Sequence, residues 1–247
     1  MLFILSVLVF LSCKEIFYNR ADKVKDGIYY LENPYGEFLK VYCEYHAGYG
    51  YTFLSSQNFA NRNRFKMDSI LQDADTKSIL FRFKDANNSQ FNSEIRQLPN
   101  YTHVHFGLLN SDYTDYTSPY NIHLGPYLYL GTLPRATIHA GAIQGYVANG
   151  QSHTFINYDW DPNSYFAFYP NLKRRSPTPV PNCCKMFGGW MKGAVKSSVT
   201  LDEDFFYQHE EHLGGGAMGI SRQLGINGVA PGVKFGLNNG KFLSISS

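Results

Sequence analysis

The stretch DGIYYLENPYGEFLKVYCEYHAGYGYTFLSS, residues 26–56, decides how the first part of the chain folds. Residues 27–31 and 38–43 are short runs of aromatic and branched side chains, and the loop between them contains Pro34 and Gly36. Two such runs joined by a turn predict a β-hairpin. Cys43 and the run AGYGYTF follow directly, so a cysteine and a glycine-tyrosine loop have to be explained together with the hairpin.

The rest of the chain also alternates short apolar runs with turns. Aromatic residues make up 16% of the 247 residues and charged residues 17%, with 22 glycines and 11 prolines, which is typical of turn-rich β structure rather than of a helical bundle. We therefore expect an α+β, mostly β fold: a single globular domain of short antiparallel strands with few helices.

Particular strands can be predicted from this alternation. They are expected at residues 79–83, 104–106, 127–130, 145–147, 153–156 and 165–169. The Asn-Gly pair inside VANGQ, residues 147–151, predicts a second hairpin. Helical spacing of apolar residues predicts a helix at 58–72. The glycine-rich end, residues 212–247, predicts turns and short strands.

The first eleven residues, MLFILSVLVFL, are apolar and uncharged. They are too short to cross a bilayer, but they match the apolar segment of a signal peptide. We therefore expect residues 1–12 to be a cleaved signal peptide and residues 13–247 to form a single secreted domain. A buried N-terminal strand is the alternative. No other stretch approaches the length and hydropathy of a membrane span.

The chain has four cysteines, Cys13, Cys43, Cys183 and Cys184. A small, even number after a signal-like start fits an oxidising compartment. The adjacent pair Cys183 and Cys184 leaves three alternatives open. The two can bond to each other, bond between chains to make a homo-oligomer, or stay reduced.

Two sequons, Asn87-Asn88-Ser89 and Asn100-Tyr101-Thr102, make Asn87 and Asn100 candidate glycosylation acceptors. The formal net charge is only +2 and the basic residues are scattered, apart from one triplet at residues 173–175. Nucleic-acid-binding proteins usually carry a basic stripe, so the sequence argues against a nucleic-acid partner.

Four short motifs lie close together near the start of the chain: SCKEI at residues 12–16, DGIYYL at 26–31, VYCEY at 41–45 and AGYGYTFL at 47–54. Together they resemble the opening of fibrinogen-related domains. The intelectin branch of that superfamily is the most similar, and the GON domain of some secreted metalloproteases has a similar opening. The likeness covers about residues 12–55, and Tyr51 replaces the tryptophan of the family.

The resemblance implies a disulfide between Cys13 and Cys43, which would tie the start of the chain to the second strand of the hairpin. Closing a loop of about 30 residues would contribute roughly 3 kcal/mol. The glycines after Cys43 would allow a tight turn, with Tyr49, Tyr51 and Phe53 packing inward. Residues 13–55 would then form a fibrinogen-like N-terminal unit of a secreted recognition domain.

The run FYQHEEHLGGGAMG, residues 206–219, has two histidines and two glutamates within four positions, followed by three glycines. It loosely resembles the Glu-His-His and glycine-rich region with which intelectins bind calcium and a sugar diol. Glu210, Glu211 and His212 are therefore candidate calcium or ligand-binding residues, since Ca²⁺ takes oxygen ligands. A solvated turn or helix end is the alternative.

The run YDWDPNSY, residues 158–165, places Asp159, Asp161 and Asn163 at alternate positions. That spacing brings side-chain oxygens together in calcium loops. Asp-Pro-Asn is also an ordinary turn signal. A calcium cofactor and a plain turn are therefore both open for these residues.

These observations favour a secreted, lectin-like recognition module that binds a glycan or a cell-surface or matrix protein through loops on a β scaffold. Aromatic faces stack on sugars, and amides hydrogen-bond to hydroxyls. One alternative is a structural protein assembled through Cys183 or Cys184. The other is a secreted hydrolase that uses Asp159, Asp161, Glu210 or His212. The sequence has no nucleophile elbow, phosphate-binding loop or dinucleotide motif, so no catalytic residue is assigned.

Overall fold

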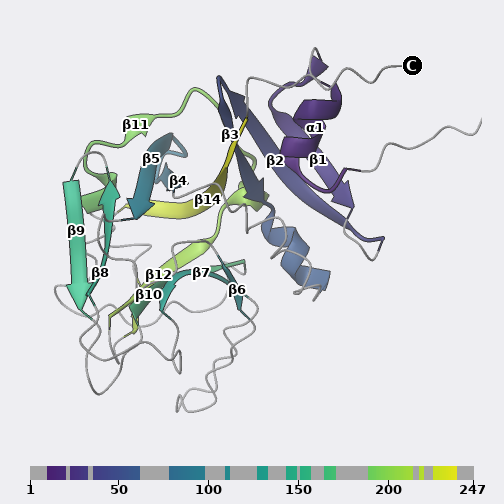
Figure 1. Cartoon of the computed structure of the whole chain (residues 1–247). Helices are drawn as coiled ribbons and strands as arrows, with labels where there is room; N and C mark the ends of the chain where they lie inside the picture. The colour runs from purple at the N-terminus through teal and green to yellow at the C-terminus, as the bar shows by residue number, and fades with distance from the viewer. Residues whose placement is uncertain are drawn as a thin grey trace, which may run out of the picture.

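The computed structural model describes residues 10–20, 23–32, 36–61, 78–97, 109–111, 127–132, 143–148, 151–156, 164–170, 189–213, 217–219 and 225–237. In these residues the chain has the predicted α+β, mostly β fold, with two antiparallel sheets (Figure 1). The helical elements with assigned bounds are α1 (Cys13–Arg20), η2 (Ser56–Asn61) and η4 (Glu203–Phe205). Residues 189–191 add one further helical turn.

The larger sheet has nine strands within the described residues, and we call it sheet A. Its order is β1 (Gly27–Glu32), β2 (Phe38–His46), β3 (Tyr49–Leu54), β14 (Ile226–Gly236), β4 (Ser78–Asp85), β5 (Gln90–Gln97), β8 (Ile143–Ala148) and β9 (Gln151–Ile156), and β11 (Val195–Lys196) also pairs with β5. The predicted hairpins are confirmed by the strand pairing: Glu32 lies opposite Phe38, and Ala148 lies opposite Gln151.

The glycine-rich end of the chain differs from the prediction, because it supplies the eleven-residue strand β14 in the interior of sheet A. β14 pairs with β3 through Gly232 and Phe53 and with β4 through Val229 and Phe83. The glycine is required at this place, since a Cβ on Gly232 would lie 2.5 Å from the Phe53 ring. A glycine in a strand can therefore mark a close approach of a large side chain rather than a turn.

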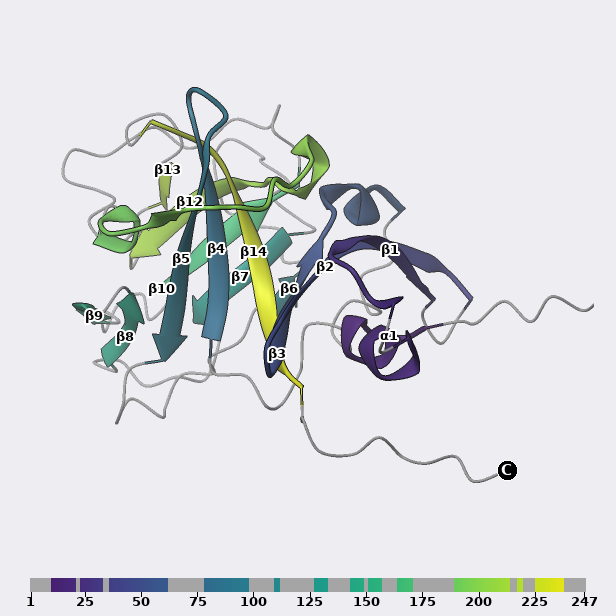
Figure 2. The same ribbon diagram turned by 90° about the horizontal axis from the view of Figure 1, so that it is seen from above.

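The smaller sheet, sheet B, has five strands within the described residues. Its order is β13 (Ala217–Gly219), β12 (Gln208–Leu213), β10 (Ser164–Tyr169), β7 (Tyr127–Thr132) and β6 (Leu109–Ser111). Figure 2 shows its strands running behind sheet A at an angle. The two sheets enclose the main core, in which the Phe81 ring lies 5.3 Å from Phe168 and the Trp190 ring lies 4.5 Å from Phe166.

The N-terminal unit is fixed by the predicted disulfide between Cys13 and Cys43, whose Cα atoms are 5.6 Å apart. The helix α1 was not predicted, although its start carries a capping signal. Ser12 Oγ accepts the Glu15 backbone N–H at 3.1 Å, and Glu15 Oε2 accepts that of Leu11 at 2.7 Å. This reciprocal pair resembles a capping box.

Three residues before Cys13 also belong to the folded unit. Phe10 is buried in the main core, and its carbonyl accepts the Glu32 backbone N–H at 3.0 Å. The expected boundary between residues 12 and 13 therefore runs through contacts of the described structure. Residues 1–9 lie outside the described residues.

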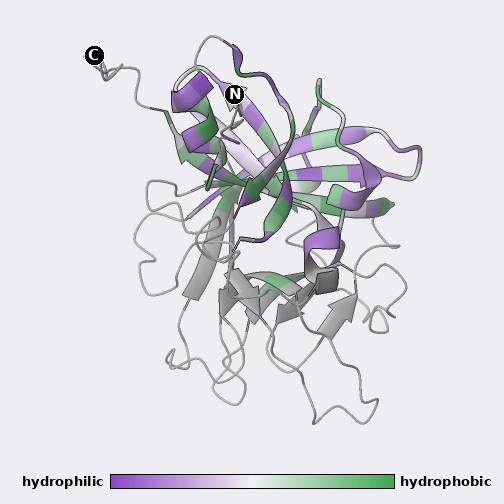
Figure 3. Ribbon diagram, turned by 90° about the vertical axis from the view of Figure 1, so that its right-hand side faces the viewer, coloured by the Kyte–Doolittle hydropathy of each residue, from purple (hydrophilic) through white to green (hydrophobic). Residues whose placement is uncertain are grey.

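The face of sheet A that points away from sheet B has its own, smaller core. Leu80, Phe53 and Tyr51 pack there against Leu201, Phe205 and Phe206. The segment that contains η4 crosses sheet A on this side (Figure 2). The Gln90 side-chain amide holds this segment by two hydrogen bonds of 2.9 Å, one donated to the Leu201 carbonyl and one accepted from the Leu201 N–H. Hydrophilic and hydrophobic residues alternate along the strands, as Figure 3 shows, which matches a sheet with a different environment on each face.

The other expected elements have mixed outcomes. The strands expected at 79–83, 127–130, 145–147, 153–156 and 165–169 are present as β4, β7, β8, β9 and β10. The helix expected at 58–72 is only the short η2 up to Asn61, and the rest of that range lies outside the described residues, as does the strand expected at 104–106. In the described part of the chain, no helix combines the length and the apolar character that crossing a membrane requires.

Candidate binding site

The turn between β2 and β3 begins the candidate site. His46 and Tyr49 face each other across a two-residue loop, Ala47-Gly48. Gly48 adopts φ +82°, a left-handed conformation that a glycine takes at little cost. The turn brings the rings of His46 and Tyr49 together as a stack with centroids 4.9 Å apart. This is the role of the glycine-tyrosine run after Cys43.

Side chains from four strands of sheet A continue this stack into one row on the face away from sheet B. We call the row the cationic shelf and define it as His46 from β2, Tyr49 and Tyr51 from β3, Lys234 from β14, and Glu94 and Arg96 from β5. The Lys234 ammonium lies 4.2 Å from the centroid of Tyr49 and 5.8 Å from that of Tyr51. Tyr49 is therefore contacted from the strands on both sides of β3.

Ion pairs hold the charged members of the shelf in place. Glu94 accepts hydrogen bonds from Lys234 at 2.8 Å and from Arg96 at 2.9 Å. Burial raises the pKa of the Glu94 carboxyl, but the hydrogen bonds from Lys234 and Arg96 outweigh it and keep that pKa below its ordinary value. Glu94 is therefore a carboxylate at neutral pH, with both cations fixed beside it.

A buried ion pair supports the other end of the shelf. Glu44 Oε1 is 2.9 Å from His46 Nε2, and Glu44 Oε2 accepts a hydrogen bond from the Arg82 guanidinium at 2.7 Å. Arg82 also donates to Asn92 at 2.8 Å and lies 5.0 Å from the centroid of the Phe53 ring. Glu44 and Arg82 are buried, so this pair fixes the position of the half-exposed imidazole from below.

Tyr51 acts as a neutral hydrogen-bonding group. Burial, followed by the charge of Glu94, raises the pKa of the Tyr51 hydroxyl far above its ordinary value. The hydroxyl stays protonated and can donate a hydrogen bond. The shelf thus combines hydroxyl, imidazole, ammonium and guanidinium groups on an aromatic floor.

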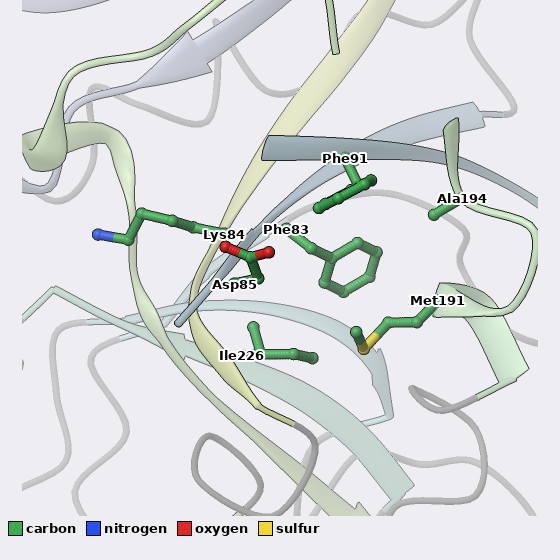
Figure 4. A pocket seen from close by; sticks show the side chains of 7 residues that line it. All are labelled: Phe83, Lys84, Asp85, Phe91, Met191, Ala194 and Ile226. Atoms are coloured by element: carbon green, nitrogen blue, oxygen red, sulfur yellow. The ribbon is translucent and has the colours of Figure 1, made fainter. Parts of the chain in front are cut away.

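A cavity of about 240 Å³ lies on the other face of sheet A, between the β4–β5 hairpin and the turn at residues 189–191. Phe83, Phe91, Met191 and Ile226 surround it, whereas Lys84 points away (Figure 4). The Asp85 carboxylate at this cavity already accepts two backbone N–H groups, from Asn87 and Ser89. Because binding pockets need convergent polar groups as well as apolar walls, we prefer the shelf as the candidate site.

The residues predicted to bind calcium do not form a described site. Asp159, Asp161 and Asn163 lie outside the described residues. Glu210, Glu211 and His212 belong to β12, where they pair with β10 and β13. The alternative of a turn or helix end at 210–212 is therefore wrong, because the backbone there is a strand. Within the part of the chain that the structure describes, no cluster of three or more His, Cys, Asp and Glu side chains is suited to a metal ion.

Of the remaining predicted sites, one lies among the described residues and the others lie outside them. Asn87 is exposed in the turn between β4 and β5, where a glycan could be attached. Asn100, Cys183 and Cys184 lie outside the described residues.

The shelf itself was not predicted, because its charged members lie far apart in sequence: Glu94 and Lys234 are 140 residues apart. Only the alternation of His46, Tyr49 and Tyr51 around the turn gave a local signal.

Comparisons of the chain with protein-family models, curated proteins and solved structures found no match. They therefore do not bear on the resemblance to fibrinogen-related domains, which stays a prediction.

Proposed function

We propose that this chain is a secreted recognition module that binds a glycan at the cationic shelf. The observation that carries the proposal is the shelf itself. Its His46, Arg96 and Lys234 side chains are partly exposed donors, fixed by ion pairs beside aromatic rings on one face of a sheet. Fixed donors of this kind suit a ligand with many hydroxyl groups, because they lose little freedom on binding.

Three further features support an extracellular setting. The disulfide between Cys13 and Cys43 fits an oxidising compartment. The sequon at Asn87 lies in an exposed turn. The apolar start of the sequence matches the apolar segment of a signal peptide, and Phe10 and Ser12 at its end belong to the folded unit. A protein ligand, a bound calcium ion and an oligomer linked through Cys183 or Cys184 are finer predictions that await their own tests.

The shelf supports binding better than catalysis. His46 and Glu44 form a pair like that of a general base with the carboxylate that orients it. In the described part of the chain, however, the hydrogen bond of the imidazole is to Glu44, and no hydroxyl or thiol nucleophile is bonded to it. A binding module is therefore the function that we propose.

An array of immobilised oligosaccharides tests this function. We expect the secreted protein to bind at least one glycan class, and the double variant His46→Ala and Arg96→Ala to lose that binding while keeping its melting temperature. Lys196→Ala is the matched control, because Lys196 is exposed on β11 at the other end of β5. A protein that binds no glycan, or a double variant that binds as well as the wild type, would overturn the proposal.

A further inference from the structure

The charges of the shelf specify its ligand more closely. Both carboxylates are already paired: Glu94 with Lys234 and Arg96, and Glu44 with Arg82 and His46. Arg96 is the most exposed charged side chain, with 63% of it accessible, against 26% for Glu94, 22% for Lys234 and 4% for Glu44, and 38% of the His46 side chain is accessible. The charge that is most accessible to a ligand on the shelf is therefore the positive charge of Arg96.

The strength of this positive charge is low. The shelf has two permanent cations, Lys234 and Arg96, and one carboxylate, Glu94, which leaves one net positive charge when His46 is neutral. The Arg82 and Glu44 charges beneath it cancel. The whole chain has a formal net charge of only +2 and no basic stripe. Polyanions with several charges per repeat bind through many cations together, so a densely sulfated polymer or a nucleic acid fits this surface poorly.

The geometry of the exposed donors favours a carboxylate. The Arg96 guanidinium carries five N–H donors in a planar fork, which matches the two oxygens of a carboxylate. Only one contact, from Nη2 to Glu94, ties this group to the protein in the described structure. Its remaining donors and the Lys234 ammonium next to Glu94 can together hold a second carboxylate.

The extent of the shelf favours a chain rather than a terminal sugar. From His46 on β2 to Arg96 on β5, the order β2, β3, β14, β4 and β5 crosses four spacings between neighbouring strands. At the usual distance between strands, this row is about 19 Å long. It is a row along a sheet face and not a closed pit, so several sugar rings can lie along it.

We propose that the ligand of the cationic shelf is a linear, unsulfated oligosaccharide that contains uronic acid, with its carboxylate bound by Arg96 and Lys234 and its hydroxyls by His46 and Tyr49. This inference rests on the proposed glycan-binding function and deepens it.

The experiment is calorimetric titration of the full secreted chain with four hexasaccharides of equal length. The first alternates glucuronate with N-acetylglucosamine, the second is the same compound with its carboxylates converted to methyl esters, the third is neutral chitohexaose, and the fourth is a heparin hexasaccharide. We expect the glucuronate compound to bind at least about tenfold more tightly than its ester or chitohexaose, because a charge-assisted pair is lost in both. We expect the heparin compound to bind no more tightly than the glucuronate compound.

Two substitutions that each remove one charge give effects of opposite sign. Arg96→Gln should weaken binding of the glucuronate compound about tenfold. Glu94→Gln should strengthen it severalfold, because it removes a competing carboxylate, and a merely structural role of Glu94 could not produce that gain. Lys196→Gln, an exposed charge away from the shelf, should change nothing.

The possible failures are distinguishable. If the ester and chitohexaose bind as tightly as the glucuronate compound, and Glu94→Gln changes nothing, the acidic-sugar inference is overturned while glycan binding stands. If heparin binds most tightly, the inference is also overturned, in favour of a sulfated ligand. If none of the four compounds binds, the inference fails, and the oligosaccharide array then decides whether the proposed function fails with it.

Discussion

Replacing Glu44 by glutamine tests whether the buried ion pair holds the sheet and the shelf together. The side chain of Glu44 is 4% exposed and that of Arg82 is 0% exposed. The amide of glutamine keeps the shape of the carboxylate but not its charge, so the Arg82 guanidinium would stay buried without a counter-charge. Its Nη1 atom is already buried without a hydrogen-bond partner among the described residues, so it has no nearby substitute.

The expected loss is large. Removing one partner of a buried ion pair typically costs about 3–5 kcal/mol, because the remaining charge is left uncompensated in a medium of low polarity. For a chain of this size each kcal/mol lowers the melting temperature by about 2–4 °C, so a decrease of about 6–20 °C is expected. The control is Arg96→Gln. The side chains of Arg96 and its partner Glu94 are 63% and 26% exposed, Glu94 keeps its hydrogen bond from Lys234, and exposed pairs contribute at most about 1 kcal/mol.

The assay is urea unfolding followed by near-ultraviolet circular dichroism, with the disulfide kept oxidised. A double variant, Glu44→Gln with Arg82→Met, completes the comparison, since removing both charges should recover part of the lost stability. The reasoning is refuted if Glu44→Gln and Arg96→Gln lower the free energy of unfolding by the same small amount, or if the double variant is less stable than the sum of its single changes predicts.

Three further predictions concern stability. Replacing Cys13 and Cys43 by alanine should lower the free energy of unfolding by about 3 kcal/mol, measured by urea unfolding; no loss would mean that the disulfide does not stabilise the N-terminal unit. Burial lowers the pKa of His209 to about 3, so below pH 6.5 the unfolded chain takes up a proton that the folded chain excludes, and stability should fall by about 1.4 kcal/mol per pH unit as the pH drops from 6.5 towards 3. His209→Asn should remove that part of the slope, and identical slopes in the two proteins would contradict the prediction. Phe10→Ala should destabilise the fold by about 3 kcal/mol and Ser12→Ala by about 1 kcal/mol, measured by thermal melting; variants that melt like the wild type would show that these residues lie outside the folded unit.

The part of the fold that local pattern decides could be predicted from the sequence. The hairpin of β1 and β2, the strand β4 and the Asn-Gly hairpin of β8 and β9 follow from alternating residues between turn signals, and all three are present. The disulfide followed from the resemblance of the opening motifs. The helix α1 could have been predicted as well, because Ser12 and Glu15 have the spacing of a capping box.

The remaining features depend on contacts between distant parts of the chain. β14 contains Pro231 and Gly232, residues that are rare in interior strands, and it is stabilised by β3 and β4 on either side. The shelf arises in the same way, since β14 inserts between β3 and β4 and thereby brings Lys234 beside Tyr49 and Glu94. A pattern of period two predicts which residues share a face of one strand, but not which strands become neighbours.

The central claim is the location of the site, and mapping a bound oligosaccharide by nuclear magnetic resonance tests it most directly. The glucuronate hexasaccharide would be titrated into isotope-labelled protein while the backbone amide signals are followed. We predict that the largest shifts lie at His46 to Tyr51, at Glu94 to Arg96 and at Lys234, which meet only on the shelf. Shifts concentrated on β12, or around the cavity lined by Phe83 and Met191, would contradict the account.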